Sequence, residues 1–539
     1  MMRRARSHRT RSLCAVVIAI AIAATATTAH ATSLLDTIRQ RGVLVVAVKT
    51  DYPPFGMLSR EAVQEGFEHD LAADLAMRLG VQLHTVGVTG TNRLQVLDEG
   101  RADVTIATLG DTSERRQIAT LIEPDYYSSG VTLMTRPDST LKTWAAIRGE
   151  TVCATQGSYF NRTVATRYLA TLQIYANGRD AKLGVRDKRC VGWLFDNTAI
   201  AGDLLTPEWR GYRIGLPPEL MTPWAIAIAR TAKDDPLGTF IGDTVADWHR
   251  SGLLIALERK WGLPPSAFLA DMHTLWTRRE PNGAWLCRRQ ADGQWPPTCR
   301  NPIFVTSTDV TGLRSWGLRV FEKTGINLTY IYDDYERAEF LHGLWLTLAL
   351  TVCCVSGSLM CGVVLALLAA REWPVVSRAL RGFALVARMT PPLLQIYVLV
   401  FGIGSLVAAR WGLQCNAFVA VVASLSLYTG AGVMQALEDA ARHERRLTPG
   451  FSLRIATIGP LIHQASASVT ALLVNVTKAT MMASAVAVPE LLSVSTSIVA
   501  EHGNVATMMN TLMLMFLLPV FGVLGLLRWM EKRGTHGRH

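Results

Sequence analysis

Residues 97–116, LDEGRADVTIATLGDTSERR, place an apolar, β-branched run directly before a short polar turn and a pair of arginines. The apolar run predicts a strand, and the Gly-Asp-Thr-Ser sequence predicts the turn that ends it. Ligands of open α/β sheets bind beyond the carboxyl ends of the strands. Arg115 follows this strand, so it lies where a ligand-binding side chain is expected.

The flanking segments alternate between strands and helices. Residues 42–49, GVLVVAVK, form a β-branched run that predicts a buried parallel strand. The alternation continues through RGETVCATQG (148–157) and CVGWLFD (190–196). This order predicts doubly wound α/β lobes. Residues 66–81 carry apolar side chains at helical spacing: Phe67, Leu71, Leu75 and Leu79.

The composition separates the chain into two halves. The length of 539 residues predicts two or three domains, and the apolar content of 49% is concentrated after Phe340. The net charge of +11 does not indicate nucleic-acid binding, because no run of Lys and Arg is interleaved with stacking aromatic residues. We therefore expect no nucleic-acid partner.

Residues 1–31 have the pattern of a secretory signal peptide. Several arginines precede an apolar core, and the small-residue site Ala29-His30-Ala31 follows it. The core is short for a membrane span, so we expect cleavage after Ala31 rather than a retained anchor. The domain that follows is then exported to an oxidising compartment.

The cysteines of the exported part permit two disulfides, because they are even in number. The segment WLCRRQADGQWPPTC (285–299) predicts a hairpin around Asp292-Gly293, which would bring Cys287 and Cys299 within bridging distance. Zinc is the weaker alternative, since no further His or Cys stands at ligand spacing. We expect no metal and no other cofactor. The four cysteines are Cys153, Cys190, Cys287 and Cys299.

Residues 34–263 resemble the periplasmic amino-acid-binding proteins of solute-binding family 3. The resemblance rests on eight segments in family order, among them LLDTIRQRGVLVVAV, DYPPF, EPDYYSSGVTLM and DWHRSGLLIALERKWG. It implies an α/β domain of the two-lobed type II fold that closes on a ligand. The implied boundaries are 32–272 for this domain, with lobe 1 at 32–137 and 225–272 and lobe 2 at 138–224.

The resemblance also implies a set of ligand-binding residues. Arg115 matches the arginine that grips the α-carboxylate, a role suited to a planar, bidentate donor. Asp196 matches the lobe 2 carboxylate that receives the α-ammonium. The remaining matches are Tyr52 and Phe55 as the side-chain wall, Thr108 as a hydroxyl donor, Gly110 as a backbone N–H donor, and Ser158 near a helix N-terminus.

Simpler interpretations remain open for several of these residues. Asp196 could cap the helix that starts near Asn197, and Tyr52 could serve wall packing alone. Arg116 is expected to be a solvated surface cation. Lys49 stands where many relatives that bind neutral or basic ligands carry Asp, so it predicts an acidic ligand if it faces the cleft. The alternative is that Lys49 points to solvent.

The second half predicts about five membrane crossings. A segment starting at 341 and others near 383–408, 415–436 and 506–528 are long and apolar enough, and 461–489 is less apolar because Asn475 and Lys478 interrupt it. With the first domain outside, the Arg-rich loops lie inside, as the positive-inside rule requires.

Residues 337–535 resemble the permease subunit of amino-acid ABC importers, after a periplasmic connector at 273–336. The likeness rests on LHGLWLTLAL, VARMTPPLLQIYVLVFGIG and VTKATMMASAVAVPELLS. It implies a cytoplasmic coupling loop for an ATPase subunit, with Glu438, Ala440 and Ala441 matching its start and Gly450 placed late. It also implies that Lys478 lies near the translocation path, although Lys478 could instead reach water at a helix break.

These features predict the substrate-binding and permease subunit of an ABC importer for polar amino acids, multi-pass in a bacterial inner membrane with its binding domain in the periplasm. No G-x-x-x-x-G-K-[ST] motif occurs, so we expect a separate cytoplasmic ATPase and no enzymatic activity of this chain. One permease half per chain implies a homodimer or a second permease. The alternatives are a ligand sensor and a dehydratase-like enzyme with Glu68, His69 or Glu114 as general acid.

Overall fold

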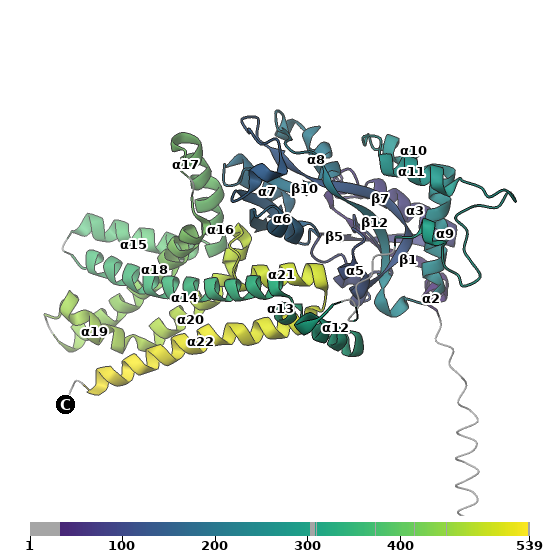
Figure 1. The fold of residues 1–539 in the computed structure, drawn as a ribbon. Helices are drawn as coiled ribbons and strands as arrows, with labels where there is room; N and C mark the ends of the chain where they lie inside the picture. Colours follow the sequence, from purple (N-terminus) through teal and green to yellow (C-terminus); the bar gives the residue numbers. More distant parts are fainter. Residues whose placement is uncertain are drawn as a thin grey trace, which may run out of the picture.

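The computed structural model consists of an α/β domain followed by a bundle of long helices (Figure 1). It describes residues 33–301, 308, 310–371, 373–413, 415–448 and 450–536, with side chains as far as residue 525. The predicted signal peptide at 1–31 lies outside the described residues.

Two lobes share one nine-stranded sheet in the α/β domain. In lobe 1, β1 pairs in parallel with β5 and β6, as the β-branched runs predict. In lobe 2, β8 pairs in parallel with β9 and β10. The strand order is β5 (Gln82–Val88), β1 (Val43–Lys49), β6 (Val104–Ile106), β12 (Glu219–Ala229), β7 (Ala119–Thr135), β10 (Gly192–Asp196), β8 (Thr151–Thr155) and β9 (Thr171–Tyr175), with β11 (Arg213–Ile214) on β7.

The strands β7 and β12 cross between the lobes, which confirms the predicted two-lobed type II fold. The first part of β7, Ala119 to Ile122, pairs with β12 in lobe 1, whereas Val131 to Thr135 pairs with β10 in lobe 2. The predicted lobe boundary at 137/138 falls just after the end of β7 at Thr135 and stays a prediction, since this one long strand pairs in both lobes. A small sheet of β2 (Asp51–Tyr52), β3 (Gly56–Leu58) and β4 (Gln64–Glu65) lies beside lobe 1.

Helices cover the sheet, and their ends follow local sequence signals. The helix α3 (Phe67–Leu79) buries the four apolar residues predicted from spacing and ends at Gly80, whose φ of 72° suits glycine. The other helices of this domain are α2 (Leu34–Arg41), α4 (Gln95–Asp98), α5 (Ser113–Ile118), α6 (Asn161–Arg167), α7 (Gly178–Arg186), α8 (Asn197–Leu204), α9 (Pro236–Ser251) and α10 (Leu253–Lys260), with short 3₁₀ turns at Trp144–Ile147, Pro207–Trp209 and Arg230–Ala232.

The predicted connector packs partly on the α/β domain. Helix α11 (Ala267–Trp276) runs across the predicted boundary at 272, so the domain extends further than the sequence indicated. A turn at 290–294 and a disulfide between Cys287 and Cys299 hold the segment after it. The connector continues with a 3₁₀ turn at Pro297–Cys299, α12 (Gly312–Thr324) and α13 (Thr329–Tyr332).

Within the described part of the chain, five helices are long and apolar enough to cross a membrane: Asp334–Ala369, Pro392–Trp411, Ala417–Leu447, Ser466–Val486 and Val505–Gly525. The predicted span near 383–408 is wrong in its limits, because α15 ends at Met389 and a new helix begins at Pro392. Two successive prolines disfavour a continuous helix there. The elements are α14 (Asp334–Ala369), α15 (Pro374–Met389), α16 (Pro392–Tyr397), the π-helix η5 (Val398–Ile403), α17 (Gly404–Trp411), α18 (Ala417–Leu447), α19 (Ile455–Gln464), α20 (Ser466–Ala479), the 3₁₀ helix η6 (Thr480–Val486), α21 (Leu491–His502) and α22 (Val505–His536).

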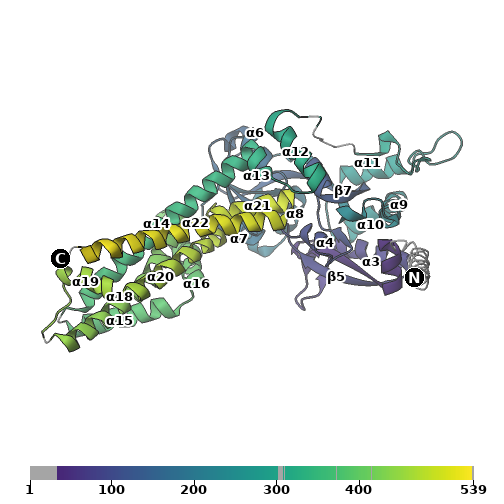
Figure 2. The ribbon, with the colours of Figure 1, turned by 90° about the horizontal axis from the view of Figure 1, so that it is seen from below.

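The α/β domain sits at one end of the helical half. Both views place α21 and the first residues of α14 at the end that faces the domain (Figures 1 and 2). This arrangement is relevant to function because it brings the opening between the two lobes close to the helical half.

Candidate ligand-binding site

A cavity of about 790 Å³ lies between the lobes. Its volume suits a small molecule. Both lobes contribute to the lining, and so does Tyr397 of α16 in the helical half. Of the residues predicted from the sequence, Lys49, Tyr52, Thr108, Ser158 and Asp196 line it.

Asp196 is the last residue of β10 and directly precedes α8. Its side chain makes no capping hydrogen bond to α8, and Oδ1 is buried without a hydrogen-bond partner. Burial raises the pKa of Asp196 to about 6, although a hydrogen bond from Tyr52 and the charge of Arg93 oppose this shift. A buried carboxylate oxygen left open toward a cavity can receive a ligand cation.

Arg115 is fully buried in α5, which Thr112 caps through its hydroxyl. Its guanidinium donates to Gly110 O at 3.0 Å and to Gly157 O at 3.1 Å, and Nε has no partner. The pKa of Arg115 falls to about 9 because of burial and the nearby charge of Arg93. Arg115 does not itself line the cavity; its guanidinium lies 5.6 Å from the ring centre of Tyr159, which does.

Arg93 is a cavity residue that the sequence reasoning missed. It donates to Ala107 O and Thr108 O at 2.7 Å each and to Gly157 O at 3.2 Å. Arg93 and Arg115 therefore share one carbonyl acceptor, and neither forms an ion pair with a carboxylate among the described residues. Arg93 precedes the short helix α4 in a polar loop, where an arginine is usually solvated, so no local signal in the sequence indicates its role.

Lys49 is buried at the end of β1 and does not point to solvent. Its Nζ pairs with Asp51 Oδ1 at 2.6 Å and lies 5.9 Å from the ring centre of Tyr52. Lys49 therefore faces the cavity, but its charge is already partly neutralised.

The remaining predicted residues divide between the cavity and the core. The Tyr52 hydroxyl lies 3.1 Å from Thr198 Oγ1 and joins the two lobes. Thr108 Oγ1 accepts a hydrogen bond from Arg93 at 3.4 Å, whereas the Thr108 N–H donates to Glu68 Oε1. Phe55 and Gly110 do not line the cavity. Phe55 packs in the lobe 1 core, and the Gly110 carbonyl holds Arg115.

Glu68, His69 and Glu114, the residues considered for an enzymatic role, do not line the cavity either. Burial raises the pKa of Glu68 to about 7, and the hydrogen bonds from Tyr126 and the Thr108 N–H oppose the shift. Both bonds are accepted by Glu68 Oε1, whereas Oε2 is buried without a partner among the described residues.

Arg116 is not the solvated cation that the sequence suggested. It pairs with Asp111 and, at 2.7 Å, with Glu123, and its side chain is nearly buried. Two carboxylates close in sequence make this burial possible, because a buried cation needs such partners.

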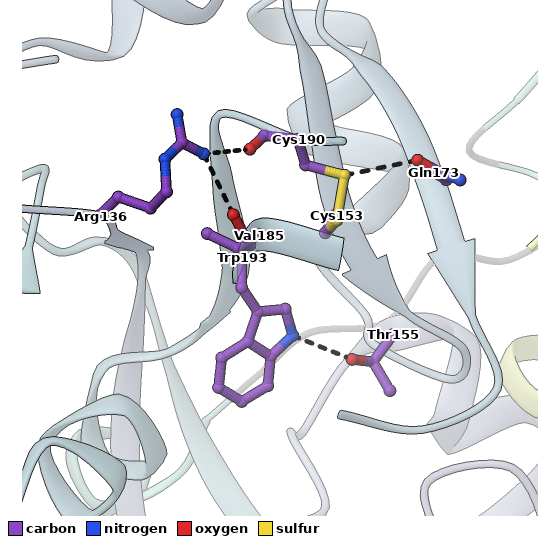
Figure 3. The surroundings of a disulfide bond; sticks show 7 residues. All are labelled: Arg136, Cys153, Thr155, Gln173, Val185, Cys190 and Trp193. Atoms are coloured by element: carbon purple, nitrogen blue, oxygen red, sulfur yellow. Dashed lines mark hydrogen bonds between the residues drawn. A yellow bond between two sulfur atoms is a disulfide. The ribbon is translucent and has the colours of Figure 1, made fainter. Parts of the chain in front are cut away.

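A disulfide joins Cys153 of β8 to Cys190, just before β10 (Figure 3). Nearby, the Trp193 Nε1–H donates to Thr155 Oγ1 at 3.1 Å, and both side chains line the cavity. The disulfide thus ties together two strands that carry cavity residues.

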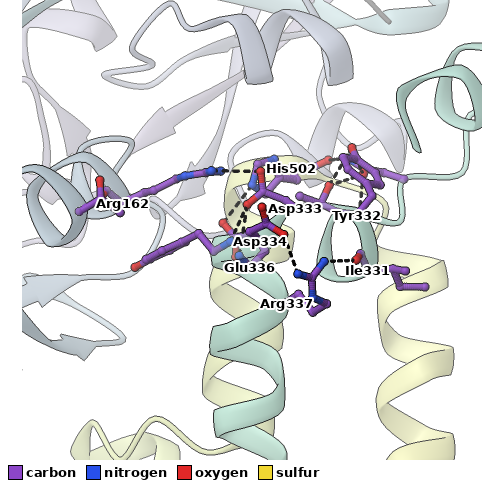
Figure 4. A network of polar contacts seen from close by, with 12 residues as sticks. Arg162, Ile331, Tyr332, Asp333, Asp334, Glu336, Arg337 and His502 are labelled. Atoms are coloured by element: carbon purple, nitrogen blue, oxygen red, sulfur yellow. Dashed lines mark hydrogen bonds and ion pairs between the residues drawn. The ribbon is translucent and has the colours of Figure 1, made fainter. Parts of the chain in front are cut away.

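Among the described residues, Glu336, Glu501 and His502 could offer three ligand atoms to a metal, all within 4.8 Å of one another. His502 Nε2 lies 3.2 Å from Glu336 Oε1, and Asp333 next to them pairs with Arg162 of lobe 2 (Figure 4). Glu336 and His502 thus form a hydrogen-bonded pair within the helical half, and the neighbouring Arg162–Asp333 pair joins lobe 2 to that half.

The residues predicted for ATPase coupling lie mainly in a helix. Glu438, Ala440 and Ala441 belong to α18, where both alanines are buried and Glu438 pairs with Arg381 at 3.0 Å. Helix α18 continues to Leu447 because the intervening residues are good helix formers. The loop that follows the helix is therefore shorter than the loop that the sequence predicts. Gly450 lies after it, with φ at 90°.

Lys478 lies in the last turn of α20, where the α-helix gives way to the 3₁₀ helix η6. Its side chain is exposed on the helical half. An exposed lysine at a change of helix type fits both interpretations of this residue, so its role in translocation stays a prediction.

Comparison with known proteins identifies the class. Residues 44–264 match the family of bacterial extracellular solute-binding proteins, family 3. The chain is 25% identical over 231 residues to the L-cystine-binding protein TcyJ of Escherichia coli K12, covering 42% of this chain and 85% of TcyJ. It is 32% identical over 136 residues to a glutamine-binding protein of Geobacillus stearothermophilus, covering 24% and 52%. The chain thus contains a family 3 solute-binding domain with amino-acid-binding relatives.

Two further matches are a solved structure and an enzyme. A crystal structure of a mutant of ArgBP from T. maritima matches with a TM-score of 0.39 and 26% identity, covering 42% of this chain and 98% of ArgBP. The cyclohexadienyl dehydratase of Pseudomonas aeruginosa is 32% identical over 125 residues, covering 23% of this chain and 46% of the enzyme. Relatives of this domain therefore include an enzyme as well as binding proteins.

Proposed function

We propose that this chain is the substrate-binding and permease subunit of an ABC importer for polar amino acids. The observation that carries the proposal is the distribution of unpaired charge around one cavity. Asp196 Oδ1 has no hydrogen-bond partner, and the guanidinium groups of Arg93, which lines the cavity, and Arg115, behind Tyr159, are bonded only to neutral oxygens among the described residues. This arrangement complements the ammonium and carboxylate groups of an amino acid.

The helical half supports the transport part of the proposal. Five helices long and apolar enough to cross a membrane follow the binding domain in the same chain. Fusion keeps the binding domain at the membrane and raises its effective concentration there. In the proposed cycle, a ligand closes the lobes, and a separate ATPase, acting on a dimer of this half in the inner membrane, opens the path.

An acidic ligand is the finer part of the proposal. Lys49 and Arg93 both line the cavity, and both would favour a side-chain carboxylate. Asp51 opposes this preference because it already pairs with Lys49. A ligand carboxylate would therefore have to compete with Asp51, whose side chain is partly exposed and can turn outward.

Calorimetric titration of the full chain in detergent with L-glutamate, L-aspartate, L-glutamine, L-cystine and L-arginine tests the ligand class. We expect binding of at least one polar amino acid, and tightest binding of arginine would contradict the acidic preference. Arg115→Lys should weaken binding about tenfold or more, because a lysine cannot reproduce the planar, bidentate donor. ATP-dependent uptake by vesicles that contain the chain and its ATPase tests transport; binding without uptake would favour a sensor.

The dehydratase relative motivates a second candidate function. Such an enzyme needs a general acid in the cavity, yet Glu68 does not line it; Tyr126 and the Thr108 N–H donate to Glu68 Oε1, while Oε2 has no partner among the described residues. Formation of product from prephenate or arogenate by the purified chain would establish the enzymatic alternative, and its absence together with amino-acid binding would support the importer.

A further inference from the structure

Helix α21 contacts both lobes close to the cavity. On lobe 2, Gln156 Nε2 lies 3.3 Å from Ser493 O and 3.3 Å from Thr496 Oγ1. On lobe 1, a Cβ on Gly503, the residue that ends α21, would lie 3.2 Å from Ile118. Helix α21 has 12 residues and is not one of the candidate membrane spans. It therefore lies between the α/β domain and the helices that could cross a membrane.

The segment that contacts α21 also lines the cavity. Gln156, Gly157 and Ser158 all contribute to the lining. A Cβ on Gly157 would lie 2.4 Å from Gly90 O on lobe 1 and 3.4 Å from Ala500 Cβ on α21. The backbone at Gly157 is thus confined between lobe 1 and α21. A close-packed contact of this kind passes a displacement on to its neighbours.

A ligand would act on this segment directly. The Gly157 carbonyl accepts from Nη2 of Arg93 at 3.2 Å and from Nη2 of Arg115 at 3.1 Å. A ligand carboxylate is a stronger acceptor than a neutral carbonyl and would take donors away from Gly157. A buried carbonyl that loses its donors is unfavourable unless the backbone moves to find others.

Lobe 2 is also attached to the helical half away from the cavity. Arg162 pairs with Asp333 at 3.0 Å, and Ser405 Oγ donates to Asp187 Oδ2 at 2.5 Å. Lobe 2 is therefore joined to the helical half by polar contacts, whereas lobe 1 meets α21 through the packing of Ile118 of α5 against Gly503. When the lobes move relative to each other, the end of α21 at Gly503 must change its contact with Ile118 on lobe 1.

We propose that α21 is the element through which the helical half detects an occupied cavity, and that Gln156 is the positioning residue that links the cavity to α21. The inference rests on the proposed function and adds its regulation. It assigns a role to Ser493 and Thr496, which contact Gln156 but do not line the cavity.

Hydrogen exchange of residues 491–502 tests the inference. It is measured on the full chain in lipid nanodiscs, without ligand and with saturating L-glutamate, L-glutamine or L-cystine. We expect a ligand that binds to change the exchange rates in α21 about fivefold, the factor that one hydrogen bond of ordinary net strength contributes. The double variant Ser493→Ala/Thr496→Val removes the two side-chain acceptors of Gln156, Ser493 Oγ at 3.4 Å and Thr496 Oγ1 at 3.3 Å, and leaves the backbone acceptor Ser493 O. The ligand should bind this variant within about twofold of its wild-type affinity, but the change in α21 should fall to about half of the wild-type change or less.

Ser497→Ala is the matched control, because the Ser497 hydroxyl bonds only within the helix, to Ser493 O at 3.1 Å. This variant should respond to ligand like the wild-type chain. If the double variant does not fold, Thr496→Val alone should show a reduced response. Ligand binding without any change in α21, or a full response in the folded variants, overturns the inference and leaves the proposed function intact. Failure of every ligand to bind the wild-type chain overturns both.

Discussion

The α/β domain and the helical half treat apolar and charged side chains in opposite ways. In the domain, the large apolar side chains are mostly inside, and several charged groups are buried in pairs, such as Arg116 with Glu123 and Lys182 with Asp203. In the helical half, many large apolar side chains are exposed along the candidate spans. The surface of the domain is therefore suited to water, whereas the surface of the long helices is suited to a hydrocarbon environment.

The most direct test of this difference introduces the same charge at one exposed position in each half of the chain. Val352 in the middle of α14 is 64% exposed, and Val63 in the domain is 61% exposed. If the helices cross a membrane, Val352→Asp should reduce stability by about 2.5 to 3.5 kcal/mol, because a charge at the centre of a span is unfavourable. Val63→Asp should change stability by less than about 0.5 kcal/mol, as surface substitutions usually do.

The measurement is the thermal unfolding of both variants in lipid nanodiscs, together with the amount extracted from membranes. Equal effects of the two substitutions would contradict the membrane location of α14.

Removal of the open carboxylate in the cavity should give the next largest effect. Asp196→Asn keeps the shape of the side chain but leaves a ligand ammonium without a charged partner, so affinity should fall about 50-fold. The control is Asp203→Asn, since Asp203 also lines the cavity but is paired with Lys182 at 2.6 Å. The control should change affinity by less than about threefold. Calorimetry on the full chain compares the two, and similar losses in both variants would refute the special role of Asp196.

The pH dependence of binding follows from the same carboxylate. Because the pKa of Asp196 is raised to about 6, the unliganded site takes up a proton as the pH falls through 6. Affinity should then drop about fivefold between pH 6 and pH 5, because only the ionised carboxylate pairs with an ammonium. Stability of the empty domain should change in the opposite direction, since a raised carboxylate pKa makes the folded state bind more protons than the unfolded state between about 4 and 6.

Calorimetry and thermal unfolding across pH 4.5 to 8 measure the two effects. Asp196→Asn should flatten the affinity profile. A wild-type profile that is already flat would show that Asp196 is not titrating at the site.

The sequence predicted the fold well because the fold depends on local signals. Strand β1, helix α3 and the spacing of apolar segments in the second half were all readable from periodicity and turn residues. The burial of Arg116 and the contribution of Arg93 were not, because both depend on groups brought together by the fold. Arg93 reaches Gly157 across 64 residues of sequence, and no local pattern encodes that contact. Tyr397 in the cavity lining required the arrangement of the two halves, which neither half specifies alone.

The smallest expected effect is on ligand selectivity, and it tests how a paired charge at the cavity differs from an unpaired one. Asp51→Asn removes the partner of Lys49, whose ammonium is buried beside the cavity. The affinity ratio of L-glutamate to L-glutamine should rise about threefold, a modest gain because the exposed part of Asp51 is screened by solvent. Asp70→Asn is the matched control: Asp70 pairs with Lys260 at 2.6 Å and does not line the cavity, so the ratio should stay unchanged. Competition binding on the full chain gives the ratio directly, and an increase that favours L-arginine instead would exclude Lys49 as the group that selects the side chain.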